Sequence, residues 1–149
     1  MGPLMTTGTT PPLAAFEGTW QVTRQITDHR AGTTALFEGS AVFVPDETGL
    51  AYHETGHLHL PGHAPFVAER RYHWRVQDGA LHVDFEDGRV FHSIDSARHE
   101  ATHWCDPDTY VVHYDFDDWP LWHSRWDVSG PRKAYEMITS YSREAKDSR

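Results

Sequence analysis

Cysteine, basic residues and long apolar runs are all scarce in this sequence of 149 residues. The single cysteine, Cys105, excludes an internal disulfide framework and fits a reducing compartment. Only 13 lysines and arginines oppose 22 aspartates and glutamates, so the chain has no basic stripe for a nucleic acid backbone. No apolar run approaches the roughly 20 residues that a membrane-spanning helix needs. We therefore expect a soluble, cytoplasmic protein that binds neither nucleic acid nor membrane.

The N-terminal stretch lacks the features of a signal peptide. Residues 1–15, MGPLMTTGTTPPLAA, contain neither a basic segment nor an apolar one, which predicts a disordered tail. The length of the chain suits one domain with its own hydrophobic core. We expect this domain to span residues 16–143, followed by a short C-terminal tail over residues 144–149.

A helical period is also missing, and two-residue alternation replaces it along the chain. Turn signals such as Pro61-Gly62 and Asp87-Gly88 separate the alternating segments. The meander predicts an all-β protein, an up-and-down antiparallel β-barrel of about eight to ten strands, with a two-sheet sandwich as the alternative. The expected strands cover residues 19–26, 35–44, 50–60, 66–76, 81–86, 89–95, 99–105, 109–116, 121–128 and 135–143.

Both ends of the predicted barrel carry a recognisable pattern. Gly18-x-Trp20 begins the first strand and Arg143 ends the last, which resembles the calycin pattern of lipocalins and fatty-acid-binding proteins. In that pattern a late arginine packs across the ring of a first-strand tryptophan. Residues 16–143 also resemble the mainly bacterial family DUF6314, and this resemblance implies a calycin-like barrel without an assigned activity. The segments that carry it are WQVTRQI, GLAYHETG, AERRYHWRV, FEDGRVFHSID, HWCDPDTYVVHYDF, WDVSGPRKAYEM and YSR.

Three charged residues share a strand face with large apolar side chains: Arg24, Glu54 and Arg70. An unpaired buried charge is unfavourable, so these residues should pair with one another, with tyrosine hydroxyls or with a ligand. One interpretation is an internal Arg–Glu–Tyr network that fixes the register of the barrel. The other is a pocket where an arginine not paired with Glu54 grips an anionic group. The predicted ligand-binding residues are Arg24, Tyr52, Arg70, Tyr72, Trp74, Tyr110, Tyr114, Trp122, Trp126 and Tyr135.

The histidines of YHETGHLHLPGH raise the question of a metal site. His57-x-His59 is the nearest pattern to a metal-binding motif, because side chains two apart on a strand share a face. The apolar residues of this strand have the opposite parity, however, which directs His53, His57 and His59 towards solvent. We therefore predict no metal site here.

Two residues are candidates for acid–base catalysis. Glu54 is the carboxylate of its strand that lies on the cavity face. His103 enters the cavity if Trp104 points outward, and it would then be a general acid or base. Cys105 ends the same strand and is interpreted as a buried, inert thiol in preference to a nucleophile. Lys133 lies in a charged turn that is either simply solvated or a basic lip at the mouth of the barrel.

Three functions fit these patterns. The first is a barrel that binds a small, anionic or polar-aromatic molecule, with Arg24 and Arg70 as anchors. The second is a cofactor-free lyase, isomerase or cyclase that uses Glu54 or His103 for proton transfer in the same cavity. The third is a haem or metal protein with an inward histidine. We prefer the first, expect a small-molecule ligand or substrate and no cofactor, and leave a homodimer open.

Overall fold

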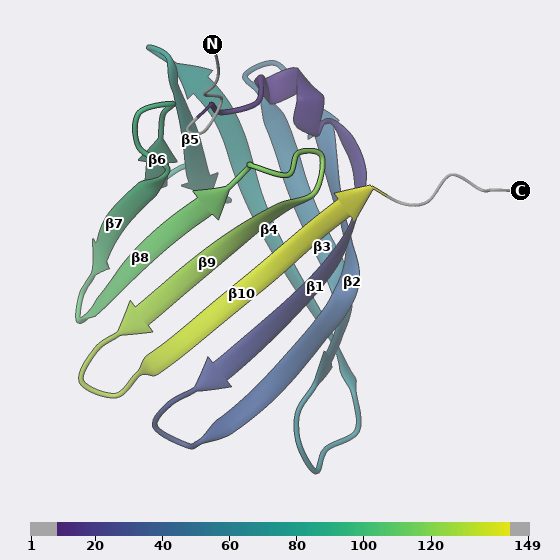
Figure 1. Cartoon of the computed structure of the whole chain (residues 1–149), viewed down its shortest axis with the longest axis vertical. Coiled ribbons are helices and arrows are strands. Elements are labelled where there is room, and N and C mark those ends of the chain that lie inside the picture. Colours follow the sequence, from purple (N-terminus) through teal and green to yellow (C-terminus); the bar gives the residue numbers. More distant parts are fainter. Residues whose placement is uncertain (1–8, 144–149) are drawn as a thin grey trace, which may run out of the picture.

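The alternating segments form ten antiparallel strands of one sheet in the computed structural model, which describes residues 9–143 (Figure 1). This confirms the predicted all-β barrel, and a single sheet excludes the two-sheet sandwich. Residues 1–8 of the expected N-terminal tail and the whole expected C-terminal tail, residues 144–149, lie outside the described residues. The elements are η1 (Leu13–Phe16), β1 (Gly18–Asp28), β2 (Thr33–Pro45), β3 (Leu50–His59), β4 (Phe66–Gln77), β5 (Ala80–Phe85), β6 (Val90–Ile94), β7 (Glu100–Cys105), β8 (Asp108–Asp115), β9 (Trp122–Ser129) and β10 (Ala134–Arg143).

The barrel is nearly closed. Its strand order is β6-β5-β4-β3-β2-β1-β10-β9-β8-β7, so β1 pairs with both β2 and β10 and joins the two halves. The edge strands β6 and β7 follow each other in the chain and lie side by side (Figure 1). Within residues 9–143 no strand ladder joins them. We call this unpaired junction the β6–β7 seam.

Aromatic side chains close the end of the barrel that carries η1. Trp20 is fully buried, and its indole N–H donates a hydrogen bond of 2.8 Å to the carbonyl oxygen of Phe16. The guanidinium of Arg143 lies 3.7 Å from the centre of the Trp20 ring and donates to the carbonyl oxygens of Ala15 and Glu17. This is the tryptophan–arginine contact that the calycin resemblance implies. The Phe16 ring in turn packs against the rings of Phe43, Trp74, Phe116, Trp119 and Trp122.

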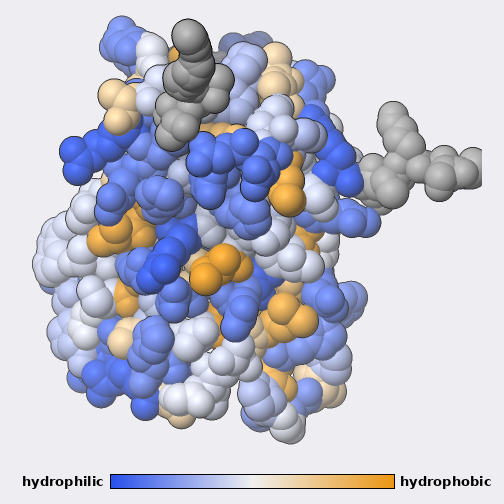
Figure 2. Space-filling model, in the orientation of Figure 1, coloured by the Kyte–Doolittle hydropathy of each residue, from blue (hydrophilic) through white to orange (hydrophobic). Residues whose placement is uncertain are grey.

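Strand parity separates the interior from the surface as predicted. On β3, Tyr52 and Glu54 are buried, whereas the side chains of His53 and His59 are 38% and 41% exposed and His57 is also exposed. The outward direction of these histidines is therefore confirmed. Figure 2 shows one face of the molecule, on which hydrophilic side chains surround scattered hydrophobic ones. No helix within residues 9–143 is long and apolar enough to cross a membrane.

Candidate functional site

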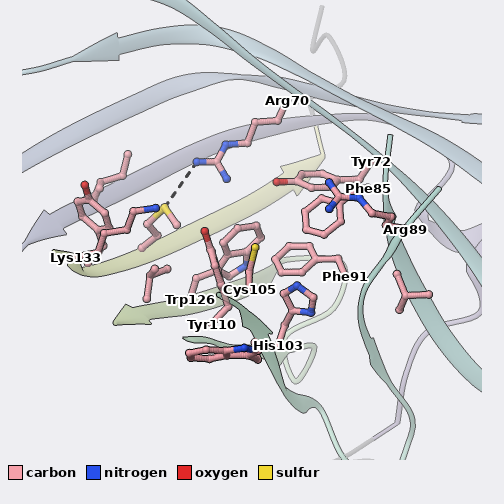
Figure 3. Close-up of a pocket in the computed structure, with 16 residues that line it drawn as sticks. Arg70, Tyr72, Phe85, Arg89, Phe91, His103, Cys105, Tyr110, Trp126 and Lys133 are labelled. Atoms are coloured by element: carbon pink, nitrogen blue, oxygen red, sulfur yellow. Dashed lines mark hydrogen bonds between the residues drawn. The ribbon is translucent and has the colours of Figure 1, made fainter. Parts of the chain in front are cut away.

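A cavity of about 670 Å³ occupies the part of the barrel remote from the aromatic end (Figure 3). Its lining includes Ile26, near the far end of β1, and Tyr135, at the start of β10. One side of the cavity is aromatic and comes from strands β4 to β9, while the other side is aliphatic. The aromatic side consists of Tyr72, Phe85, Phe91, His103, Tyr110 and Trp126, and the aliphatic side includes Ile26, Val128 and Met137.

Among residues 9–143, three cationic side chains line this cavity, Arg70, Arg89 and Lys133, and no carboxylate does. This is notable in a chain whose net charge is −9. Two of the three cations have a carboxylate partner outside the cavity. Arg89 lies 2.8 Å from Asp87, and Lys133 lies 3.0 Å from Asp108. Because these two cations are paired, the partners of Arg70 determine whether the cavity has an unpaired positive charge.

Arg70, on β4, forms no ion pair with a carboxylate in the described part of the chain. Its guanidinium lies 3.8 Å from the sulfur of Met137, the contact dashed in Figure 3, and 5.4 Å from the centre of the Trp126 ring. Both partners are weak compared with a carboxylate. The guanidinium therefore keeps donors available on the cavity side.

Arg70 forms no ion pair with Glu54 because the Glu54 carboxylate hydrogen-bonds Arg24 instead. Two hydrogen bonds of 2.7 and 2.8 Å join the Arg24 guanidinium to both carboxylate oxygens, and Tyr52 donates a third of 2.5 Å. Arg24 also donates to the Thr139 hydroxyl at 2.8 Å. Burial alone would raise the pKa of Glu54. The hydrogen bonds and charge of Arg24, with smaller contributions from the Tyr52 hydrogen bond and the charge of Arg70, outweigh burial and hold that pKa below its ordinary value of 4.5. Glu54 is thus an ionised carboxylate whose two oxygens both accept hydrogen bonds within the protein.

Both sequence interpretations therefore describe part of the interior. Arg24, Glu54 and Tyr52 form the internal network, and Arg70 is the arginine left over from it. Of the predicted site residues, those on the cavity wall are Arg70, Tyr72, His103, Tyr110, Trp126 and Tyr135. Those outside this wall are Arg24, Tyr52, Glu54, Trp74, Tyr114 and Trp122.

The sequence predicts that His103 enters the cavity if Trp104 points outward, and the side chains of β7 have this arrangement. Trp104 is 61% exposed, and the His103 ring lies 5.3 Å from Phe91 and 5.9 Å from Phe85, on the cavity wall. Cys105 is exposed, so the expectation of a buried thiol was wrong. The physical reason is that Cys105 is the last residue of β7 and lines the cavity beside His103 instead of packing into the core.

Residues 16–143 match DUF6314, described as a family of unknown function. The chain belongs to this family. No curated protein matches the chain.

One buried polar side chain of this DUF6314 barrel is absent from the predicted site residues. His92, on β6, is only 4% exposed, and its Nε2 lies 2.7 Å from the Tyr114 hydroxyl. Burial lowers the pKa of His92 to about 3. Alternation could not reveal it, because β6 buries the adjacent residues Phe91 and His92 and the β5–β6 register shifts between Val83 and Asp84.

Proposed function

We propose that this DUF6314 barrel binds a small, partly apolar, anionic molecule in its cavity. The observation that carries the proposal is the position of Arg70, which lines the cavity without a carboxylate partner within residues 9–143. A half-buried guanidinium is stabilised by an anion that accepts two hydrogen bonds from it. Arg70 is therefore the anchor of the acidic group.

The remainder of the cavity supports an apolar body for the ligand. The Phe91 ring lies 4.6 Å from Phe85, 5.2 Å from Trp126 and 5.7 Å from Tyr110, so the aromatic side is a continuous surface. A cavity of about 670 Å³ lies within the range of roughly 300–1,000 Å³ that small-molecule sites occupy. Arg89 and Lys133 also line the cavity, but each is paired with a carboxylate, so the anchoring role falls to Arg70.

Acid–base catalysis in the same cavity has less support. Both oxygens of Glu54 accept hydrogen bonds from Arg24, and this carboxylate lies outside the cavity wall. His103 is on the wall, but its described contacts are rings. A catalytic base must lie on the cavity wall and also be oriented by a hydrogen-bonding partner. Binding requires only that Arg70 lines the cavity.

Binding of anilinonaphthalene sulfonate tests the proposal, because this fluorescent probe joins an aromatic body to an anionic group. We expect saturable binding by the unaltered protein and a Kd at least about tenfold higher for Arg70→Met, since a hydrogen bond to a charged group is lost. The matched control is Arg71→Met, because Arg71 is the next residue of β4 and lies exposed on the outer face.

Circular dichroism and urea unfolding establish that both variants are folded. Equal probe affinity for Arg70→Met and the unaltered protein would contradict the anchor. A comparable loss in Arg71→Met would show that the probe responds to surface charge and would also contradict it.

A further inference from the structure

A small void adjoins the cavity at Arg70. Its volume is about 20 Å³, and it extends to the Arg24–Glu54 pair. Arg70, Tyr72 and Trp126 line both the cavity and the void, so the two spaces meet at the proposed anchor. One water-sized group needs about 10–15 Å³ of such volume, so the void accommodates a hydroxyl but not a carboxylate.

One residue that lines the void, His92, has a buried polar atom that lacks a partner. Among the described residues, Nδ1 of His92 forms no hydrogen bond, although the ring is 4% exposed and Nε2 contacts Tyr114. A buried polar atom left unsatisfied destabilises the folded protein, and native structures contain few of them. The ring is neutral near pH 7, because burial lowers its pKa to about 3. Depending on the tautomer, Nδ1 of the neutral ring either donates or accepts a hydrogen bond, and a hydroxyl can be its partner in both cases.

We infer that the void is a hydroxyl subsite, in which a hydroxyl on the carbon next to the ligand's acidic group hydrogen-bonds Nδ1 of His92. The inference rests on the proposed function and narrows it, because the ligand class becomes an α-hydroxy acid with an apolar body. The adjacency of void and anchor sets this position: a hydroxyl bonded further along the ligand lies in the larger cavity, beyond the reach of the void.

Calorimetric titration with four related probes tests the subsite. The probes are naphthylacetate, the two enantiomers of its α-hydroxy derivative, and a naphthylacetate whose hydroxyl is on the far ring. We expect one α-hydroxy enantiomer to bind about tenfold more tightly than naphthylacetate, because a hydrogen bond is gained at an otherwise unsatisfied atom. The far-ring hydroxyl is expected to bring no gain.

Two further measurements assign the gain to His92. In His92→Phe, which keeps a ring of similar size, the α-hydroxy enantiomers and naphthylacetate are expected to bind equally. In the unaltered protein, nitrogen NMR is expected to show a shift of His92 Nδ1 with the favoured enantiomer and none with naphthylacetate. The NMR measurement keeps the inference testable if the variant does not fold.

The outcomes separate the two proposals. If naphthylacetate fails to bind the unaltered protein, the proposed function is overturned and the subsite with it. If naphthylacetate binds but neither α-hydroxy enantiomer gains affinity, the subsite alone is overturned and the void is a water site. A gain that persists in His92→Phe, without a shift of Nδ1, also overturns it.

Discussion

Arg24 and Arg70 are the same residue type at inward positions of the same barrel, yet their surroundings give them different roles. Glu54 lies directly opposite Arg70 in the β3–β4 ladder, but its carboxylate hydrogen-bonds Arg24 from β1. Arg24 is 5% exposed and its hydrogen bonds are made within the protein. Arg70 is half-buried and contacts a thioether and an aromatic ring. One arginine therefore stabilises the fold, and the other is available to a ligand.

The structural role of Glu54 leads to a stability prediction. Glu54→Gln leaves the Arg24 charge buried without a counter-ion, so we expect the free energy of unfolding to fall by about 3–5 kcal/mol. The double change Arg24→Met with Glu54→Leu removes both charges, and we expect it to recover most of that loss. Urea unfolding followed by tryptophan fluorescence measures both. A Glu54→Gln protein as stable as the unaltered one would refute the assignment.

His92 leads to a prediction about acid. Its pKa is about 3 in the folded protein and ordinarily 6.5, so between these values the unfolded chain binds one more proton than the folded one. The free energy of unfolding therefore falls as pH decreases from 6.5 towards 3, by about 1.4 kcal/mol per pH unit from this residue. We expect His92→Phe to show a slope smaller by that amount. Parallel pH profiles of the two proteins would contradict this prediction.

At the scale of elements, strand β2 explains why a charge on β1 reaches one on β3. Strands are about 4.8 Å apart, so Arg24 must cross β2 to meet Glu54. On β2 the residue opposite Glu54 is Ala41, which is fully buried, and two positions before it is Gly39. These small residues leave the interior above β2 free for the two longer side chains.

Gly39 has a second role in the same element. It lies opposite Gly56 of β3, and a Cβ atom on Gly39 would stand 2.1 Å from the carbonyl oxygen of Thr55 and 2.6 Å from the Cα of Gly56. Only glycine allows the two strands to approach so closely. The glycine pair is therefore a packing requirement of the β2–β3 ladder and does not by itself indicate a ligand.

The strands themselves were predictable, because alternation and turn chemistry are local properties. The expected segment 135–143 falls within β10 (Ala134–Arg143), and the turn signal Asp87-Gly88 lies between β5 and β6, where Gly88 has a φ of +94°. Parity also gave the inward direction of Arg24, Glu54 and Arg70. It could not give the Arg24–Glu54 pairing, because that contact crosses an intervening strand and depends on the volume at Gly39 and Ala41.

At the scale of the whole molecule, the site depends on how the barrel closes. A meander pattern does not specify which consecutive strands are left unpaired, so the β6–β7 seam could not be predicted from the sequence. The cavity wall includes Phe91 from one side of the seam and His103 from the other. Parity gave the direction of each wall residue, whereas the closure of the sheet decided which residues border the cavity together.

The seam also predicts a pattern of hydrogen exchange. The β1 strand has ladder partners on both sides, whereas β6 and β7 each have one. We expect backbone amides of β6 and β7 to exchange with solvent faster than those of β1, on the order of ten- to hundredfold, because local opening breaks fewer interactions there. Exchange followed by mass spectrometry measures this. Equal protection of β1, β6 and β7 would show that the edges are held by other contacts.

A barrel with one unpaired junction resists twisting less than a fully closed barrel, because the two edge strands can slide past each other. At the β6–β7 seam such sliding leaves every ladder from β6 through β1 to β7 intact. The two edge strands carry Phe91 and His103, so a small shear of the barrel changes the separation of those rings without unfolding any strand. Such a shear would alter the aromatic wall of the cavity and leave Arg70 in place, because β4 is paired on both sides.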